Sequence, residues 1–127
     1  MPESNWEAKQ QEARAAGEKA GLHFDGGKRD WSLLPFEAIE GLVGVLEYGA
    51  QKYGRTNWKK GIAFTRVWNS AMRHLIAWRA GQDIDPESKL QHLSHALCNL
   101  MFLAFYSQSP TLMVDFDDRV LPLETTT

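Results

Sequence analysis

Apolar residues along this chain recur at the three- and four-residue spacing of an α-helix in three long stretches. The first stretch lies between Pro35 and Gly54. Proline suits the first turn of a helix, where its missing N–H costs no hydrogen bond, and glycine suits the left-handed residue that ends one. We therefore predict a helix of about five turns there. Its apolar face is expected to contain Phe36, Ile39, Val43, Leu46, Ala50 and Tyr53.

Two further helices are predicted downstream. The second spans Phe64 to Ala80, with Gly81 as its stop, and the third runs from about Glu87 to Tyr106. Asp85 followed by Pro86 has the form of a helix N-cap, so capping is the simplest role for Asp85. The expected apolar positions are Phe64, Val67, Trp68, Ala71, Leu75 and Trp78 on the second helix, and Leu90, Leu93, Ala96, Leu97, Leu100 and Ala104 on the third.

The two ends of the chain are less apolar than its centre. Residues 1–21 are polar and predict a short N-terminal helix or arm. Residues 107–127 predict a C-terminal arm and a disordered tail, with 111–116 apolar enough to pack as an arm or a short strand. No internal repeat and no other β-type alternation are present. The pattern predicts one all-α domain over residues 1–127, a helical bundle of three long helices plus a short N-terminal helix.

Composition narrows the class of protein. The 127 residues are enough to bury a core, and the net charge of −2 gives no global positive field that would favour a stable nucleic-acid partner. The single cysteine, Cys98, excludes an intramolecular disulfide framework and fits a reducing, cytoplasmic setting. The sequence has no apolar signal core and no run of about 18 apolar residues, so it predicts no membrane association.

Three groups of side chains indicate a nucleotide site. Glu37, Glu40 and Glu47, with acids in the 83–87 loop, offer the oxygen ligands that Mg²⁺ or Mn²⁺ prefers, although glutamates on a helix are equally well explained as solvated. Cationic side chains neutralise phosphates, and aromatic side chains stack on bases. The cations are Lys28, Arg29, Lys52, Arg55, Arg66 and Arg73, and the aromatics are Trp31, Tyr53 and Trp58.

A polar row interrupts the apolar third helix. His92, His95 and Asn99 follow one another at helical spacing, and such groups are costly to bury without partners. Their roles stay open between metal ligand, proton relay and hydrogen-bond donor to a phosphate or base. Zinc is disfavoured because the HExxH pattern is absent.

An ordered set of motifs over about residues 22–106 resembles the bacteriophage dATP/dGTP diphosphohydrolase family (MazZ), which is related to the MazG-like all-α nucleotide pyrophosphatases. The motifs are Lys28, Leu33-Leu34-Pro35, Glu37-Ala38, Tyr48-Gly49-Ala50, Lys52-Tyr53, Asn57-Trp58, Arg73-His74-Leu75, the run from Gly81 to Ser88, His92-Leu93-Ser94-His95-Ala96 and Asn99.

The resemblance implies a MazG-like fold and an activity. It implies hydrolysis of dGTP and dATP to the monophosphate and pyrophosphate, with Mg²⁺ or Mn²⁺ as cofactor. In some phages such an enzyme supplies dGMP for modified DNA. It further implies a homodimer or homotetramer in the host cytoplasm, with the nucleotide as the small-molecule partner.

The resemblance also implies roles for individual residues. Glu37 and Glu40 match a Glu-x-x-Glu metal-binding pair, but the Glu-x-x-Asp expected on the third helix is replaced by His92 and His95. Glu47 and Asp85 are therefore expected to complete the metal ligands. The expected catalytic residues are Glu37, Glu40, His92 and His95. The expected substrate-binding residues are Lys28, Lys52, Tyr53, Asn57, Trp58, Arg73 and Asn99.

Two other classes of protein fit parts of the pattern. A non-enzymatic helical protein- or nucleic-acid-binding module would use the basic row of Arg66, Asn69 and Arg73 and would need no metal. An HD-type phosphatase would need a His-Asp dipeptide, which this sequence lacks. Metal dependence and product identity separate these alternatives from the nucleotide hydrolase.

Overall fold

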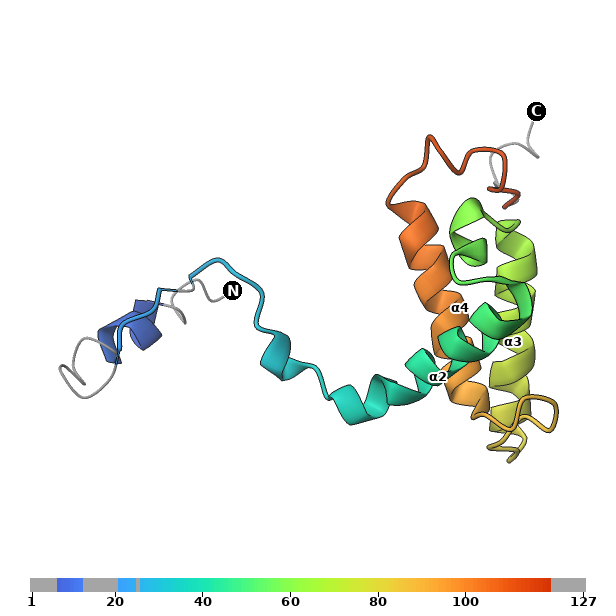
Figure 1. Cartoon of the computed structure of the whole chain (residues 1–127), viewed down its shortest axis with the longest axis horizontal. Coiled ribbons are helices and arrows are strands. Elements are labelled where there is room, and N and C mark those ends of the chain that lie inside the picture. The colour runs from blue at the N-terminus through green and yellow to red at the C-terminus, as the bar shows by residue number, and fades with distance from the viewer. Residues whose placement is uncertain (1–6, 13–20, 25, 120–127) are drawn as a thin grey trace, which may run out of the picture. The chain divides into compact units, whose positions relative to one another are not determined.

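The computed structural model describes residues 7–12, 21–24 and 26–119 (Figure 1). The chain divides into two compact units, Met1–Pro35 and Phe36–Thr127. In the first unit, residues 7–12 are helical and a short 3-10 helix, η2, spans Trp31–Leu33. The second unit contains α2 (Phe36–Tyr53), the 3-10 helix η3 (Asn57–Lys60), α3 (Phe64–Arg79) and α4 (His92–Ser107).

This element order confirms the all-α class, because the described part of the chain contains helices and no strand. The predicted N-terminal helix is confirmed over residues 7–12. Its remainder and the predicted disordered tail at 120–127 lie outside the described residues. The expectation of a single domain over 1–127 stays a prediction.

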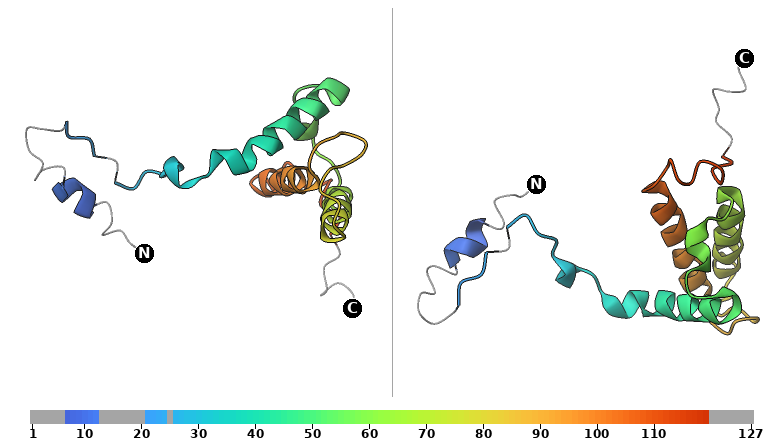
Figure 2. Two further views of the ribbon diagram at one scale, coloured as in Figure 1. Left: turned by 90° about the horizontal axis from the view of Figure 1, so that it is seen from below. Right: turned by 45° about the horizontal axis from the view of Figure 1, so that its top comes forward.

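Helix α4 is the central element of the second unit. It packs along α3 and also contacts α2 and η3 (Figures 1 and 2). At the crossing of α2 and α4, Gly41 lies directly against Ser94. A Cβ on Gly41 would stand 3.2 Å from the Ser94 Cβ and would overlap its Oγ. Glycine at this position therefore allows the two helices their close approach.

The hydrophobic core lies where α3 begins and α4 ends. Its buried members are Phe64, Val67, Tyr106 and Met113, and the Phe64 and Tyr106 rings stack with centroids 5.7 Å apart. Tyr106 is fully buried, and its hydroxyl donates a 2.6 Å hydrogen bond to the Trp58 carbonyl oxygen. This bond satisfies the phenol and ties η3 to α4.

The third long helix begins five residues later than predicted. Residues 86–88 form a turn, and α4 starts at His92. Asp85 caps that turn rather than a helix, with its carboxylate accepting from the N–H of Ser88 at 3.2 Å. Lys89 has a left-handed φ of 66°, which a continuous α-helix cannot contain. The prediction was wrong because an Asp-Pro sequence caps a turn as readily as a helix.

The apolar faces were predicted only in part. On α3, Phe64, Val67 and Ala71 are buried as expected, but Trp68 is 55% exposed. On α4 the expected leucines at 93, 97 and 100 are exposed, whereas Ala96, Cys98 and Tyr106 are buried. Because α4 is apolar on nearly every side, its pattern alone does not determine which face meets α3.

The segment after α4 folds back onto the core. Residues 110–116 form turns, so of the two alternatives for 111–116 the short strand was wrong. Met113 is buried, and the Phe64 N–H donates to the Phe116 carbonyl oxygen at 2.9 Å. The segment thus covers the start of α3. Among the described residues, no helix combines the length and apolar character needed to cross a membrane.

Candidate functional site

A cavity of about 590 Å³ opens among α2, η3, α3 and α4 of the second unit. This volume lies within the usual range of small-molecule sites. All four elements contribute polar or aromatic side chains to its wall. These are Tyr48, Lys52, Tyr53, Arg55, Asn57, Trp58, Arg66, Ser70, Arg73, His95 and Asn99.

Two glycines set the path of the chain into and out of η3. Gly54 has a φ of 96° and its N–H donates to the Ala50 carbonyl oxygen at 2.9 Å, which ends α2. The chain then reverses into η3, where the Asn57 N–H donates to the Gly54 carbonyl oxygen at 3.3 Å. Gly61, with a φ of 110°, ends η3. The reversal places Asn57 and Trp58 in the cavity wall beside the end of α2.

The cavity wall is cationic. Among its described lining residues are four Lys or Arg side chains and no Asp or Glu. The Lys52 Nζ lies 5.2 Å from the centre of the Tyr48 ring and 5.3 Å from that of Tyr53. The electrostatic interaction with Tyr48 is the largest cause that raises the pKa of Lys52, and the interaction with Tyr53 is the next. The ammonium group of Lys52 therefore stays charged. Uncompensated positive charge in a recess attracts anions. The four cations are Lys52, Arg55, Arg66 and Arg73.

Aromatic and amide groups complete the wall. The Trp58 ring stacks on Phe102 with centroids 4.6 Å apart, so one of its faces is already covered. Tyr53 is 64% exposed. The Asn99 Nδ2 donates to the Ser70 Oγ at 3.0 Å. The side-chain oxygen of Asn99, Oδ1, remains available as an acceptor.

Three histidines from α3 and α4 lie together at one edge of the cavity. The Nδ1 atoms of His74 and His92 are 2.8 Å apart, and the His92 Nε2 is 2.7 Å from the Gln82 Oε1. The rings of His74 and His95 stack nearly parallel, with centroids 4.4 Å apart. Burial, followed by the neighbouring imidazoles, lowers the pKa of His74. Burial also lowers the pKa of His95, so both rings are neutral near pH 7.

The turn before α4 holds a carboxylate next to this histidine cluster. The Asp85 Oδ2 accepts from the Ser88 Oγ at 2.8 Å and lies 3.7 Å from the His95 Nε2. Burial by itself would raise the pKa of Asp85, but hydrogen bonds from Ser88 and the Glu87 N–H outweigh burial and hold the pKa below its usual value. The carboxylate is therefore charged near neutral pH.

Most of the predicted substrate-binding residues come together in this cavity. Lys28 instead lies in the first unit, beside Arg29, and its predicted role stays a prediction. His92 is buried and does not line the cavity; its ring contacts His74, which in turn stacks on the lining residue His95. The predicted residues that line the cavity are Lys52, Tyr53, Asn57, Trp58, Arg73, His95 and Asn99.

The predicted metal ligands, in contrast, do not come together in the wall of the cavity. Glu37, Glu40 and Glu47 are exposed on α2, and none of them lines the cavity. The fourth, Asp85, is engaged by Ser88 and Glu87. Within the described residues no three His, Cys, Asp or Glu side chains form a group that could hold a metal ion. The described residues of one chain therefore do not by themselves fit a Mg²⁺ or Mn²⁺ site, and the roles of the three glutamates stay predictions.

Sequence reasoning gave no role to several residues of the site. His74 follows Val67 and Ala71 at helical spacing, so its position on the buried stripe of α3 was readable. Ser88 and Gln82 flank the turn at Asp85, and no spacing rule connects them with a histidine on α4. These contacts form only in the folded chain, so the sequence could not predict them.

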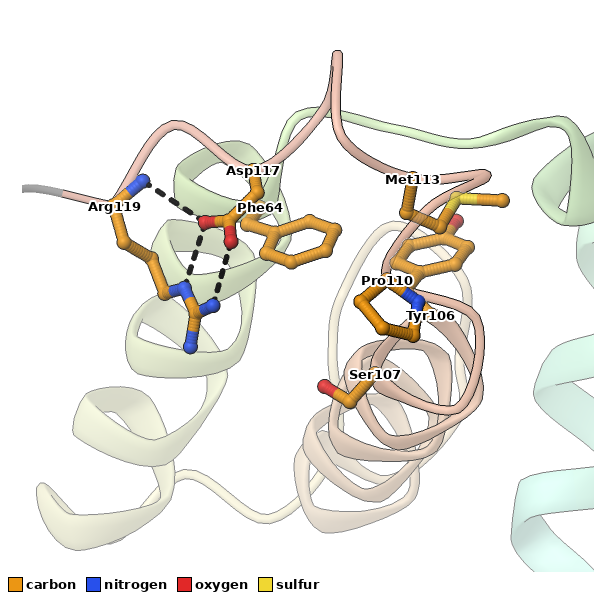
Figure 3. Close-up of a pocket in the computed structure, with 7 residues that line it drawn as sticks. All are labelled: Phe64, Tyr106, Ser107, Pro110, Met113, Asp117 and Arg119. Carbon is orange, nitrogen blue, oxygen red and sulfur yellow. Dashed lines mark hydrogen bonds and ion pairs between the residues drawn. The ribbon is translucent and has the colours of Figure 1, made fainter.

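A smaller cavity of about 180 Å³ lies at the opposite end of α4 (Figure 3). It adjoins the core residues Phe64, Tyr106 and Met113. The Arg119 guanidinium there is paired with the Asp117 carboxylate through contacts of 2.6 and 2.7 Å. Because that cation is neutralised, the smaller cavity lacks the uncompensated charge of the larger one.

Comparison with known proteins places the chain in a family. The family model described as dATP/dGTP diphosphohydrolase, N-terminal, matches residues 18–119. A protein of Salmonella phage PMBT28 named dATP/dGTP diphosphohydrolase is 39% identical over 83 residues, which are 65% of this chain. The match spans only 28% of that relative's length. No solved structure matches the chain. The family match covers the cavity and the histidine cluster, and the chain belongs to the dATP/dGTP diphosphohydrolase, N-terminal, family.

Proposed function

We propose that this chain binds dATP or dGTP in the cation-lined cavity and hydrolyses it to the deoxynucleoside monophosphate and pyrophosphate. The observation that carries the proposal is the set of four cations around a cavity with no acidic lining residue among those described. A triphosphate carries several negative charges within a few ångströms, and Lys and Arg side chains are its usual protein partners. The phage relative's name supports the choice of dATP and dGTP.

The cavity offers separate surfaces to the phosphates and to the base. Lys52, Arg66 and Arg73 would bind the phosphate oxygens and stabilise the charge that builds up on the leaving pyrophosphate. Tyr53, which is 64% exposed, and Trp58, which lines the cavity, would contact the purine.

The proposal assigns no step to a metal ion, since the described residues provide no site for one. The predicted requirement for Mg²⁺ or Mn²⁺ is tested by removing divalent ions with EDTA and adding each back. Supply of dGMP for modified DNA, and location in the host cytoplasm, stay predictions.

We also propose that the chain forms a homo-oligomer. The exposed leucines of α4, at 93, 97 and 100, lie at helical spacing on one face of the helix. An apolar face of this kind is typical of subunit interfaces. Size-exclusion chromatography with light scattering measures the state, and a monomer at micromolar concentration would contradict this expectation.

The activity is tested by incubating the protein with each of the four dNTPs, with and without Mn²⁺, and separating the products. We expect pyrophosphate and the monophosphate from dATP and dGTP. Release of orthophosphate would contradict the cleavage position, and no turnover of either purine nucleotide would overturn the function.

A matched pair of variants tests the role of the cavity. Arg73→Gln removes a lining cation, whereas Arg79→Gln removes a cation on the same helix outside the lining. Loss of one charge-assisted hydrogen bond, about 1.5–3 kcal/mol, corresponds to an approximately 10- to 150-fold fall in kcat/KM. We expect that fall for Arg73→Gln and none for Arg79→Gln. Equal effects would place the nucleotide elsewhere.

A further inference from the structure

Asp85, Ser88 and His95 form a continuous hydrogen-bonded chain from the turn before α4 to the wall of the cavity. The Ser88 Oγ is 2.8 Å from the Asp85 Oδ2 and 2.7 Å from the His95 Nε2. It also accepts from the Leu90 N–H at 3.2 Å. The serine hydroxyl thus joins the carboxylate to the imidazole by hydrogen bonds, and the Asp85 Oδ2 also lies 3.7 Å from the His95 Nε2.

The positions of the hydrogens in this chain follow from its donors and acceptors. An ionised carboxylate only accepts, so the single Ser88 hydroxyl hydrogen points to Asp85. The Ser88 oxygen must then accept from His95, which requires the hydrogen of the neutral ring to be on Nε2. In this tautomer the other ring nitrogen, Nδ1, carries a lone pair.

That lone pair is accessible. None of the described residues forms a hydrogen bond with the His95 Nδ1, yet no buried side-chain nitrogen or oxygen in the described structure lacks a partner. The Nδ1 atom is therefore not fully buried, and it belongs to a residue that lines the cavity beside Arg73 and Asn99. An unprotonated nitrogen in the wall of the proposed phosphate site is placed to accept a proton from water.

We propose that Ser88 and Asp85 are positioning residues that hold His95 as the Nε2–H tautomer, so that its Nδ1 acts as general base for the water that attacks the nucleotide. This inference rests on the proposed hydrolase function. It assigns to Ser88 and Asp85 a role in orienting a catalytic base.

The other two histidines are excluded from this role by their own hydrogen bonds. The Gln82 Oε1 accepts from the His92 Nε2–H, so the His92 Nδ1 accepts from the His74 Nδ1–H. Both His92 nitrogens are then occupied. The His74 Nε2 keeps a lone pair, but His74 does not line the cavity.

The charged and titratable groups around His95 come from every element packed against it. They are Tyr48 on α2, Arg73 and His74 on α3, His92 on α4, and Asp85 and Glu87 in the turn. Asp85 and Glu87 favour a proton on His95, while burial and His92 oppose it. The Asp85 carboxylate thus stabilises the imidazolium that forms when Nδ1 takes up a proton.

The water oxygen forms a bond to the α-phosphorus, and the bond from that phosphorus to the α–β bridging oxygen breaks. The pyrophosphate leaves with the bridging oxygen and both electrons of that bond. One water proton goes to the His95 Nδ1, and the other stays on the new phosphate oxygen until solvent removes it.

The tautomer is tested without any activity measurement. Long-range ¹H–¹⁵N correlation spectra of protein labelled with ¹⁵N-histidine distinguish a protonated from an unprotonated ring nitrogen. We expect His95 as the Nε2–H form in the wild type and a mixture of both forms in Ser88→Ala. The Nδ1–H form of His95 in the wild type would overturn the inference.

Kinetics test the role in catalysis. Loss of the base in His95→Gln should lower kcat by about 10²–10⁴-fold. Ser88→Ala should lower kcat by about 10- to 100-fold because the ring is no longer held in its productive orientation. KM should change little in either variant. Ser88→Thr keeps the hydroxyl and should restore most of the rate. The control is Ser107→Ala, which removes a serine hydroxyl that donates to the Leu103 carbonyl oxygen, and its rate should match the wild type.

The outcomes separate the two proposals. A wild type without turnover of dATP or dGTP defeats the proposed function, while the spectra still decide the tautomer. An active wild type with an unchanged kcat in folded Ser88→Ala overturns the role of Ser88. If circular dichroism shows Ser88→Ala unfolded, Asp85→Asn replaces it. An unchanged kcat in Asp85→Asn then overturns the inference. A lower kcat in Asp85→Asn, together with a kcat close to that of the wild type in Ser88→Thr, supports it.

Discussion

The crossing of α2 and α4 at Gly41 allows a quantitative test of the fold. Gly41→Ala introduces a Cβ that would overlap the Ser94 Oγ and stand 3.2 Å from the Ser94 Cβ. Gly44→Ala introduces the same methyl group one turn further along α2, where no atom lies within 4 Å apart from the chain neighbours and the nearby backbone of α2 itself. Because both substitutions are in the same helix, their gain in helix propensity, about 1 kcal/mol, cancels in the comparison.

The difference between the two variants then measures the overlap. Forcing a methyl group into a packed contact costs about 1–3 kcal/mol. The cost lies at the lower end of this range if the Ser94 Oγ turns to another rotamer. The Ser94 Cβ, in contrast, can move away only if the backbone of α4 moves with it. We expect Gly44→Ala to stabilise the protein by up to about 1 kcal/mol and Gly41→Ala to be about 1–3 kcal/mol less stable than Gly44→Ala.

Thermal and urea unfolding measure this difference, which corresponds to roughly 4–12 °C in Tm for a domain of this size. Ser94→Ala in the Gly41→Ala background removes the overlapping oxygen and should recover part of the loss, with Ser94→Ala alone completing the double-mutant cycle. Equal stability of Gly41→Ala and Gly44→Ala would refute the observed approach of α2 to α4.

Two further predictions concern pH and the turn after η3. The pKa of His74 and of His95 is lowered in the folded state, first by burial, so the unfolded chain binds more protons below its histidine pKa of about 6.5. The stability that these two rings contribute is therefore fully present above the histidine pKa of the unfolded chain. It is lost as the pH falls through the lower pKa values of the folded state. The Tm should fall between pH 7.5 and 5.5, and fall less in His95→Gln; an identical fall in His95→Gln would contradict this. Gly61→Ala places a Cβ 2.5–2.8 Å from the Phe116 ring at a φ of 110°, so urea unfolding should show it about 1–3 kcal/mol less stable than Gly81→Ala, which has a φ of 98° and open space. Equal losses would contradict that contact.

The helices themselves were largely readable from local signals. The first two long helices end where Gly54 and Gly81 adopt left-handed backbone conformations, as predicted. The start of the third helix was misjudged, because Asp85 and Pro86 give the same local signal for a turn as for a helix. Lys89 takes a left-handed φ without being Gly or Asn, so its residue type gives no warning of the break.

The candidate site was readable as a set of residue types but not as an arrangement. Lys52, Asn57, Arg73, His95 and Asn99 were selected from the sequence, and the structure brings them around one cavity. The glutamates of α2 were selected by the same reasoning and are exposed outside it. Charge and spacing do not distinguish the two groups, since both lie at helical spacing beside an apolar stripe.

The sequence by itself determined the all-α class, the ends of the first two long helices and the family, because these depend on residue type and on spacing within a few turns. Only the tertiary structure decided which face of α4 is buried and that Ser88 joins Asp85 to His95. The physical reason is that these contacts depend on how α2 and α3 cross α4 and on the path of the loop between α3 and α4. Such geometry results from the packing of many side chains together, and no single segment of the chain encodes it.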